Sequence, residues 1–334
     1  MMRVAINGFG RIGRSVFRIL NQKENIKVVA INDIFDKAAL AYLLKYDTVM
    51  GRFSENVSLE GDMLNTESQS VKLIAERDPS CLPWAEMGID ILIESTGIFR
   101  QKSQLEMHLN AGAKRVILTV PAKDEIDYTV VLGVNDNGLK PDHRIVSNAS
   151  CTTNCLAPMA KVLDSEFGIE LGVINTIHAY TNDQRLADVP HSDWRRSRAA
   201  AENVIPTTTG AARAVGKVLP ELDGKLDGIA MRVPVPDGSV VDFNVRLKRD
   251  VNEKEINDAV YEASKTGPLK DVLQYSTLPV VSTDIIGNPH SSIFDAPFTR
   301  VIEGNLIKTL NWYDNEWGYS NRVADLIGVL GKLD

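Results

Sequence analysis

Cysteine is scarce in this sequence of 334 residues, which contains only Cys81, Cys151 and Cys155. Three cysteines cannot build a disulfide framework, and none of them forms a metal-type C-x-x-C pair, so the sequence predicts no metal site. Free thiols are typical of proteins in a reducing compartment. We therefore expect a cytoplasmic protein.

Long apolar runs and an excess of basic charge are also absent. No stretch has the length of a signal peptide's apolar region or of a membrane span, which predicts no export and no membrane partner. The formal net charge of −7 disfavours nucleic acid as the main partner, because phosphate backbones are bound by basic surfaces. The chain has 44% hydrophobic residues and no internal repeat. Its length is sufficient for two domains with separate cores.

A glycine-rich turn follows the first apolar segment, residues 3–6. Gly8, Gly10 and Gly13 have the spacing G-x-G-x-x-G between a predicted strand and a predicted helix. The first glycine permits a tight turn, the second lets the backbone approach a pyrophosphate, and the third lets helix pack on strand. Alone, the pattern also fits an ordinary glycine turn.

A carboxylate in the right place strengthens the dinucleotide interpretation. The second predicted strand, residues 27–33, ends in Asp33, where a carboxylate can accept hydrogen bonds from the adenosine ribose. The same charge would repel a 2′-phosphate, which favours NAD over NADP. Further alternating strands and helices up to residue 147 predict a parallel doubly wound sheet, with residues 95–97 and 119–123 at strand ends near the nicotinamide ribose.

The middle of the chain supplies a candidate nucleophile and a candidate base. Cys151 follows small polar residues at the expected start of a helix, where the helix dipole favours a thiolate. The alternative is an unreactive buried cysteine. His178 ends an apolar strand and has the near-neutral pKa that a thiol's base needs, unless it is a hydrogen-bonded core histidine.

Two later features predict an anion site. The hydroxyl-rich turn at residues 205–212 enters a helix, and helix starts bind anions, although such turns more often serve as caps. Arg232 lies in an apolar strand, where a guanidinium is hard to bury without an anion. Together they indicate a phosphorylated substrate or a phosphate ion as co-substrate. The basic cluster at residues 194–198 could hold small anions or lie on a solvated face.

Taken together, these segments resemble the phosphorylating glyceraldehyde-3-phosphate dehydrogenases over essentially the whole chain. The resemblance is carried by five motifs: I-N-G-F-G-R-I-G at 6–13, S-N-A-S-C-T-T-N-C at 147–155, H-A-Y-T-N-D-Q at 178–184, T-T-T-G-A-A at 207–212 and W-Y-D-N-E at 312–316.

The resemblance implies a role for each matching position. Cys151 resembles the family's nucleophile and His178 its base, while Thr181 and Arg232 match the residues that hold the substrate's phosphate. The set around the attacking phosphate is matched by Ser150, Thr152, Arg196, Thr209 and Gly210. The predicted NAD contacts are Gly8, Gly10, Arg11, Ile12, Gly13, Asp33, Arg77, Thr119 and Asn315, with Asn315 orienting the nicotinamide carboxamide.

The implied architecture is α/β with two domains. A Rossmann-type doubly wound parallel sheet occupies residues 1–150, with the C-terminal helix 315–334 packing back on it. An α+β catalytic domain with a mixed, mainly antiparallel sheet occupies residues 151–314. The implied reaction is the oxidative phosphorylation of D-glyceraldehyde 3-phosphate with NAD and inorganic phosphate, through a cysteine thiohemiacetal and thioester. In the family, the loop at residues 179–199 contacts a neighbouring subunit of a homotetramer.

Two alternatives remain at this point. Erythrose-4-phosphate dehydrogenases share the chemistry but differ at segments corresponding to residues 180–182 and 207–210. A non-catalytic dinucleotide-binding regulatory protein would have no need of Cys151, His178 and both anion sets. One departure bears on the cofactor: residues 188–190 read Asp-Val-Pro where NAD-specific members commonly have Asp-Leu-Pro, which leaves some use of NADP open.

Overall fold

The structure is a computed structural model that describes residues 1–333, so Asp334, the last residue of the predicted 315–334 segment, lies outside the described residues. The chain divides into two compact units. The first contains residues 1–130 and 137–149 and the chain from Ser320 onward; the second contains residues 131–136 and 150–319. The main division therefore falls directly before the helix that begins at Cys151.

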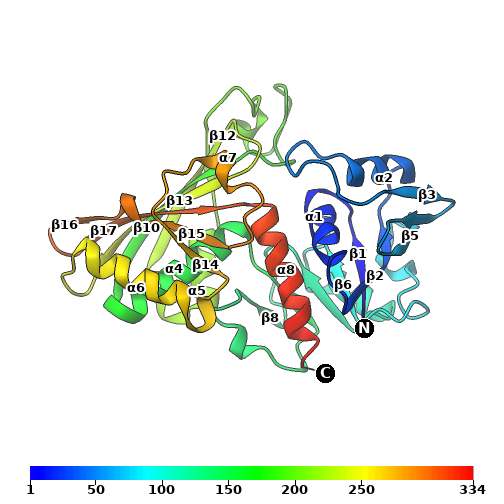
Figure 1. Ribbon diagram of the computed structural model, residues 1–334, viewed down its shortest axis with the longest axis horizontal. Coiled ribbons are helices and arrows are strands. Elements are labelled where there is room, and N and C mark those ends of the chain that lie inside the picture. Colours follow the sequence, from blue (N-terminus) through cyan, green and yellow to red (C-terminus); the bar gives the residue numbers. More distant parts are fainter. Residues whose placement is uncertain (334) are drawn as a thin grey trace. The chain divides into compact units, whose positions relative to one another are not determined.

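Within the described residues, the first unit contains a nine-stranded sheet (Figure 1). Its strands are β1 (Met2–Asn7), β2 (Ile26–Asn32), β3 (Ser58–Glu60), β4 (Met63–Asn65), β5 (Ser70–Ile74), β6 (Ile91–Glu94), β7 (Arg115–Leu118), β8 (Tyr128–Thr129) and β9 (Ile145–Ser147). Its helices are α1 (Arg11–Leu20), α2 (Lys37–Lys45) and α3 (Lys102–Asn110), and α8 (Trp317–Leu330) continues into it from the second unit.

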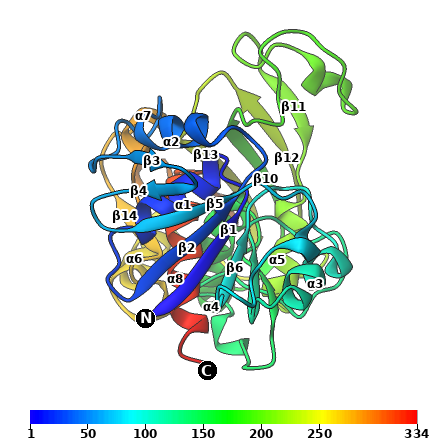
Figure 2. The same ribbon diagram turned by 90° about the vertical axis from the view of Figure 1, so that its right-hand side faces the viewer.

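The strand order β5-β2-β1-β6-β7-β9 is that of a doubly wound sheet, and every pairing along it is parallel. Figure 2 shows β5, β2, β1 and β6 side by side in this order. The chain builds outward from β1 in one direction through β2 and β5, then returns to the other side with β6. Ligands of such folds bind at the carboxyl ends of the strands where the direction reverses, here β1 and β6.

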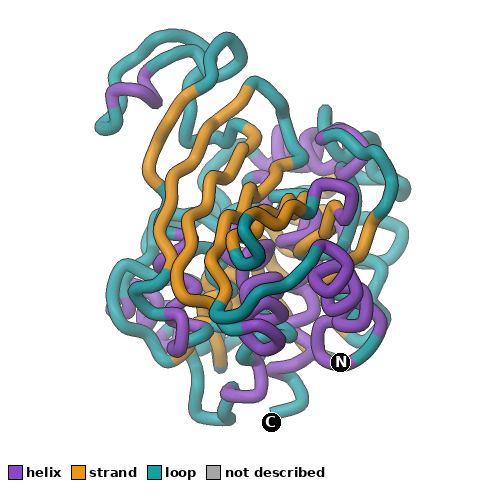
Figure 3. Tube along the Cα trace, turned by 90° about the vertical axis from the view of Figure 1, so that its left-hand side faces the viewer, coloured by secondary structure: helices purple, strands orange, loops and turns teal. Residues whose placement is uncertain are grey.

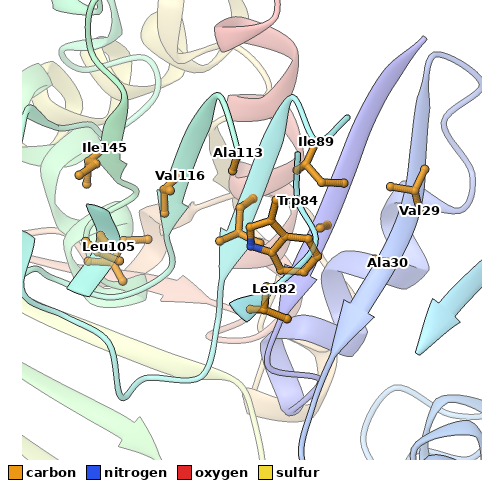
Figure 4. Packing of buried hydrophobic residues seen from close by; sticks show 12 residues of the cluster. Val29, Ala30, Leu82, Trp84, Ile89, Leu105, Ala113, Val116 and Ile145 are labelled. Atoms are coloured by element: carbon orange, nitrogen blue, oxygen red, sulfur yellow. The ribbon is translucent and has the colours of Figure 1, made fainter. Parts of the chain in front are cut away.

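The first unit's core is apolar and fully buried beneath this sheet. Trp84 lies beside Leu82 and Ile89, Leu105 belongs to the same cluster, and Val116 comes from β7 (Figure 4). At about 25 cal/mol per Å² of apolar surface removed from water, a large buried aromatic such as Trp84 is among the main contributors to the stability of this unit.

The second unit is built on an eight-stranded sheet in the order β11-β12-β10-β13-β17-β15-β14, with β16 paired to β17. Figure 3 shows its long central strands running side by side. The strands are β10 (Ile169–Ala179), β11 (Ile205–Thr208), β12 (Leu226–Val233), β13 (Ser239–Leu247), β14 (Leu273–Ser276), β15 (Ser292–Asp295), β16 (Arg300–Ile302) and β17 (Leu306–Tyr313). Only β10–β12 and β14–β15 are parallel pairs, so the sheet is mixed and mainly antiparallel, as predicted.

Helices α4 (Cys151–Phe167), α5 (Ala211–Val218) and α6 (Glu253–Lys265) pack against strands of this sheet, and the short α7 (Ser282–Ile285) contacts β17. On β10 and β12, the alternate side chains Leu171, Val173 and Ile229 are exposed. Helix α4 continues through Pro158 without interruption to Phe167. Among residues 1–333, no helix combines the length and the apolarity that crossing a membrane requires.

Candidate active site

The turn from β1 to α1 has the geometry that a dinucleotide requires. Gly8 has φ +93°, and a Cβ there would lie 2.6 Å from the Thr96 nitrogen. A Cβ on Gly13 would lie 2.1 Å from the Gly8 carbonyl oxygen, so the helix packs on the turn without space for a side chain. Gly10 is different: a Cβ there would meet no atom within 4 Å. It is the N-cap of α1 and supplies no side-chain cap, so the open helix start fits a pyrophosphate.

Asp33 directly follows β2 and ties this turn to the next loop. Its Oδ2 accepts a hydrogen bond from the Phe9 amide at 2.7 Å, and its Oδ1 accepts one from the Phe35 amide at 3.1 Å. Each carboxylate oxygen has a further lone pair, and the side chain is half-buried, so it can still accept from a ribose hydroxyl. These observations fit a bound NAD.

The other predicted NAD contacts of the first unit have different surroundings. The guanidinium of Arg11 forms an ion pair with Asp47, so this side chain has a protein partner. Burial alone would raise the pKa of Asp47, but hydrogen bonds from Arg11 and the backbone hold it below its usual value. Ile12 is half-buried and Arg77 is exposed. Thr119, directly after β7, is buried and donates its hydroxyl to the Glu94 carbonyl at 3.0 Å.

Sequence reasoning did not identify the buried polar network behind this turn. The Glu94 carboxylate, at the end of β6, accepts from the Thr96 amide at 2.8 Å and from Asn7 Nδ2 at 2.6 Å. His108 Nε2 lies 3.1 Å from the same carboxylate, and Trp84 Nε1 donates to His108 Nδ1 at 3.2 Å. Because an indole can only donate, His108 carries its proton on Nε2. The sequence signal that could have indicated this network is the glutamate at the end of the apolar strand Ile91–Glu94, because a buried charge requires hydrogen-bonding or charged partners.

The second unit brings Cys151 and His178 together. Ser150 caps α4 by accepting the Thr153 amide at 3.1 Å, which makes Cys151 the first residue of the helix. His178 lies near the end of β10, and its Nε2 is 3.6 Å from Cys151 Sγ. Two residues 27 positions apart thus form a thiol–imidazole contact, the arrangement that cysteine nucleophiles require.

The electrostatics of this pair correct one expectation from the sequence. Burial raises the pKa of the Cys151 thiol, and the charge of Arg232 and hydrogen bonds with Thr152 only partly oppose it. Burial, assisted by the charge of Arg232, lowers the pKa of His178 to about 3. The helix start was expected to favour a thiolate. Desolvation instead raises the pKa of the thiol, so the shifts of the two groups together disfavour a thiolate–imidazolium pair.

Two neighbours of His178 Nδ1 bear on the tautomer of the ring. Nδ1 lies 2.7 Å from the Ala179 carbonyl oxygen, which can only accept, and close to Arg232 Nη1, which can only donate, so the two neighbours favour opposite tautomers. With the proton on Nδ1, the lone pair of Nε2 is directed at Cys151. Arg232 Nη1 donates to the same carbonyl at 3.0 Å and lies 2.9 Å from Nδ1. Its Nε is buried without a hydrogen-bond partner among the described residues, which fits a site for an anion.

The residues predicted around the attacking phosphate have varied partners. Thr152 is buried with its hydroxyl 2.9 Å from the Tyr313 hydroxyl. Arg196 is ion-paired with Asp183, and its Nε donates to the Thr207 hydroxyl at 3.0 Å. In this structure its guanidinium therefore has protein partners rather than a free face.

The helix start at α5, like that of α1, has a glycine as its N-cap. Gly210 is its N-cap without a side-chain cap, and the Thr209 hydroxyl accepts the Ala211 amide at 3.2 Å. Thr181 is half-buried in the loop that follows β10. This arrangement retains the backbone donors expected of an anion site.

Sequence reasoning did not identify two further residues of the second unit, Tyr313 and Ser239, as contacts of the predicted site residues. Tyr313, at the end of β17, contacts Thr152 and Thr176 through its hydroxyl, 2.9 Å from each, and its ring meets the His178 ring edge-on at 5.9 Å. Ser239 donates to Asn315 Oδ1 at 2.6 Å. The sequence indicates that Tyr313 lies in a strand, but it does not predict the contacts of its hydroxyl, because Thr152 and Thr176 belong to distant elements.

A doubly wound dinucleotide-type unit together with a unit that carries a cysteine–histidine pair defines the class: a nicotinamide-dependent dehydrogenase that works through cysteine. Two family models match the chain: the "NAD binding domain" of glyceraldehyde 3-phosphate dehydrogenase at residues 2–102 and its "C-terminal domain" at residues 150–315. The chain belongs to the glyceraldehyde 3-phosphate dehydrogenase family.

Individual relatives are similar over nearly their full length. The chain is 57% identical to a glyceraldehyde-3-phosphate dehydrogenase from Borreliella burgdorferi, covering 99% of this chain and 100% of the relative. It is 55% identical to the enzyme of that name from Streptomyces coelicolor and 52% identical to that from Mycolicibacterium smegmatis, each alignment covering 99% of both chains. The predicted family, fold class, oxidoreductase activity and NAD cofactor are confirmed; the roles of individual residues stay predictions.

Proposed function

We propose that the protein converts D-glyceraldehyde 3-phosphate, NAD and inorganic phosphate into 1,3-bisphosphoglycerate and NADH. The observation that carries this proposal is the 3.6 Å contact between Cys151 Sγ and Nε2 of His178. The family membership supports the choice of substrate. We also propose that residues 1–150 with the helix 315–334 form the NAD-binding domain and residues 151–314 the catalytic domain.

The first step uses the neutral pair. Cys151 Sγ bonds to the aldehyde carbon as its proton moves to His178 Nε2, and the carbonyl oxygen takes that proton to become the hydroxyl of a thiohemiacetal. A neutral imidazole is needed here because an imidazolium has no lone pair to accept the thiol proton. The Ala179 carbonyl, 2.7 Å from Nδ1, favours the tautomer that this step requires, with the proton on Nδ1.

The second step uses the same base. His178 Nε2 removes the hydroxyl proton while the carbon loses hydride, which leaves a thioester on Cys151. NAD, when bound, would supply the acceptor for that hydride, and Asn315 would orient its nicotinamide carboxamide. Phosphate then attacks the thioester carbon, the C–S bond breaks to release the acyl phosphate, and Cys151 recovers its proton from His178. The thioester conserves oxidation energy that hydrolysis would release.

Charged and polar groups of the second unit are assigned to the two phosphates. The buried Arg232, with its unpartnered Nε, and Thr181 would hold the substrate's own phosphate. Ser150, Thr152, Arg196, Thr209 and Gly210 would surround the attacking phosphate, with Arg196 exchanging Asp183 for that anion.

NADH appearance tests the reaction directly. Purified protein with NAD and glyceraldehyde 3-phosphate is expected to turn over only when inorganic phosphate is present, and more slowly with erythrose 4-phosphate or NADP. Phosphate-independent turnover, or a preference for the tetrose or for NADP, would contradict the proposed substrate or cofactor selectivity.

The variant Cys151→Ser tests the nucleophile. We expect dehydrogenase activity to fall to the level of the background while NAD affinity, measured by calorimetry, stays within about twofold, because Cys151 is the first residue of a helix capped by Ser150 rather than part of the β1–α1 turn. Unchanged turnover would contradict the assignment of Cys151. A dinucleotide-binding protein without catalysis would show NAD binding but no activity in either form.

We also propose a homotetramer in the cytoplasm. The exposed apolar side chains Leu171, Val173 and Ile229 on one unit's sheet, and the largely exposed polar loop at residues 179–199, support self-association. Light scattering coupled to size exclusion is expected to give four times the chain mass of 36.8 kDa. The free thiols of Cys81, Cys151 and Cys155 support a reducing compartment, which cell fractionation would test.

A further inference from the structure

Asn315 is held through its main chain and its side chain by residues at and just before the start of β13. It is buried, with 5% of its surface exposed. Its main-chain N–H donates to Asp237 Oδ1 at 3.2 Å, and its side-chain Oδ1 accepts the Ser239 hydroxyl at 2.6 Å. Asp237 lies in the segment that connects β12 to β13 and Ser239 is the first residue of β13, so backbone and side chain are fixed by one short stretch.

The hydroxyl of Ser239 has a defined direction. Ser239 is fully buried, and its Oγ accepts the Ala179 amide at 3.0 Å. A hydroxyl carries one hydrogen, and in the described part of the chain its acceptor is Asn315 Oδ1. The amide oxygen of Asn315 therefore points to Ser239, and the NH2 group points away from it.

The same serine connects Asn315 to the strand that carries the base. Ala179 follows His178 on β10, and its carbonyl accepts from Arg232 Nη1 and lies 2.7 Å from His178 Nδ1. The Ala179 amide, on the other side of the same residue, donates to Ser239. Ser239 thus joins the end of β10 to the carboxamide of Asn315 through two hydrogen bonds.

We propose that Ser239 is a positioning residue for the dehydrogenase reaction: it fixes the Asn315 carboxamide so that the NH2 group is presented to the carboxamide of the bound nicotinamide. This rests on the proposed function, in which Asn315 orients that ring. With Ser239 in place, one amide orientation and therefore one face of the nicotinamide is selected. Without the hydroxyl, the Asn315 amide can rotate by half a turn, and the ring can bind with either face toward the substrate.

The test uses Ser239→Ala and a matched control, Ser292→Ala. Ser292 lies on β15, is fully buried, and accepts Asn311 Nδ2 at 3.0 Å, so its loss also removes a buried hydroxyl of this unit. With glyceraldehyde 3-phosphate deuterated at C1, proton NMR of the NADH reports which face of the ring received deuterium. Ser239→Ala is expected to raise the KM for NAD roughly 3- to 10-fold, the effect of one hydrogen bond, and to place deuterium on both faces. Ser292→Ala is expected to keep the wild-type KM and a single face.

A double-mutant cycle separates this role from an effect on His178. If Ser239 acts through Asn315, adding Ser239→Ala to Asn315→Ala changes the KM and the stereochemistry no further. If Ser239→Ala has the same effect on the KM and the stereochemistry with and without Asn315→Ala, the proposal is overturned, because Ser239 would then act on the reaction through Ala179. Ser239→Cys keeps a weaker donor and is expected to give intermediate values, which preserves the test if Ser239→Ala does not fold.

The outcomes distinguish this inference from the proposed function. An inactive wild-type protein would refute the function itself, and an unaffected Asn315→Ala variant would refute the role of Asn315. An active wild type with a sensitive Asn315, but with a Ser239→Ala variant that retains the wild-type KM and one labelled face, would overturn the positioning role alone.

Discussion

At the residue scale, the most informative feature is that Cys151 and His178 lie together in surroundings that disfavour the charged forms of both side chains. The pKa of the Cys151 thiol is raised by burial, and that of His178 is lowered to about 3. A thiolate–imidazolium ion pair at pH 6 would require shifts in the opposite directions. In the NAD-free protein, reactivity of the thiol should therefore depend on its own deprotonation at high pH.

Alkylation by iodoacetamide measures this directly. In a Cys81→Ser background, which removes the exposed thiol, we expect the rate at Cys151 to rise continuously from pH 6 to beyond about 8.5, the ordinary cysteine pKa. The rate is followed by mass spectrometry of the peptide that contains Cys151. A plateau beginning near pH 6 would contradict the neutral pair and indicate an ion pair instead.

The base gives the second prediction at this scale. His178→Asn keeps a side-chain polar group but removes the titratable nitrogen, so kcat is expected to fall by about 10²- to 10⁴-fold, the usual contribution of a general base. Binding of NAD should change by less than about twofold. Stopped-flow detection of NADH in a single turnover separates the loss in chemistry from product release. A variant with near-normal single-turnover rates would show that the 3.6 Å contact is only structural.

At the element scale, the β1–α1 turn offers two glycines with opposite constraints. A Cβ on Gly13 would lie 2.1 Å from the backbone oxygen of Gly8, so Gly13→Ala must shift the helix. A Cβ on Gly10 would meet no protein atom within 4 Å, and Gly10 has an ordinary extended backbone with φ −72°. The space beside Gly10 is thus available to a ligand rather than to packing.

These constraints predict that one glycine variant loses stability and the other loses NAD affinity. Gly13→Ala is expected to lower the melting temperature by several degrees, consistent with an overpacking cost of about 1–3 kcal/mol. Gly10→Ala is expected to melt like the wild type but bind NAD at least about tenfold more weakly, because the methyl group occupies the path of the pyrophosphate. Calorimetric titration and thermal melts measure both quantities. Unchanged NAD affinity of Gly10→Ala would show that the pyrophosphate does not approach this turn.

Elements with local signals were predictable, and those built by distant contacts were not. The strand, glycine turn and helix at residues 2–20 follow from apolar periodicity and glycine spacing alone. The edge hairpin of β3 and β4 was not predicted, since each strand has only three residues and β3 is largely exposed. Likewise, the ion pair of Arg196 with Asp183 depends on a loop conformation that residue spacing does not determine.

At the scale of the whole molecule, stability should respond to pH through a buried acid. Asp237 is fully buried, and burial together with the neighbouring carboxylates of Asp314 and Glu316 raises its pKa to about 9. In the unfolded chain an aspartate has a pKa of about 3.9. Between these two values the folded state binds more protons than the unfolded state. The contribution of Asp237 is therefore fully present below pH 4 and is lost as the pH rises toward 9.

Asp237→Asn should remove this dependence, because an amide resembles the protonated acid and can still accept from the Gly238 and Asn315 amides. The free energy of unfolding, from denaturant titrations between pH 5 and 8, is expected to fall for the wild type by at most about 1.4 kcal/mol per pH unit from one proton, and to fall less for the variant. Asp142→Asn removes the same charge from an exposed position and should follow the wild type. Parallel curves for Asp237→Asn and the wild type would show that Asp237 is ionised in the folded protein, so that its desolvation is offset by donors near its Oδ2.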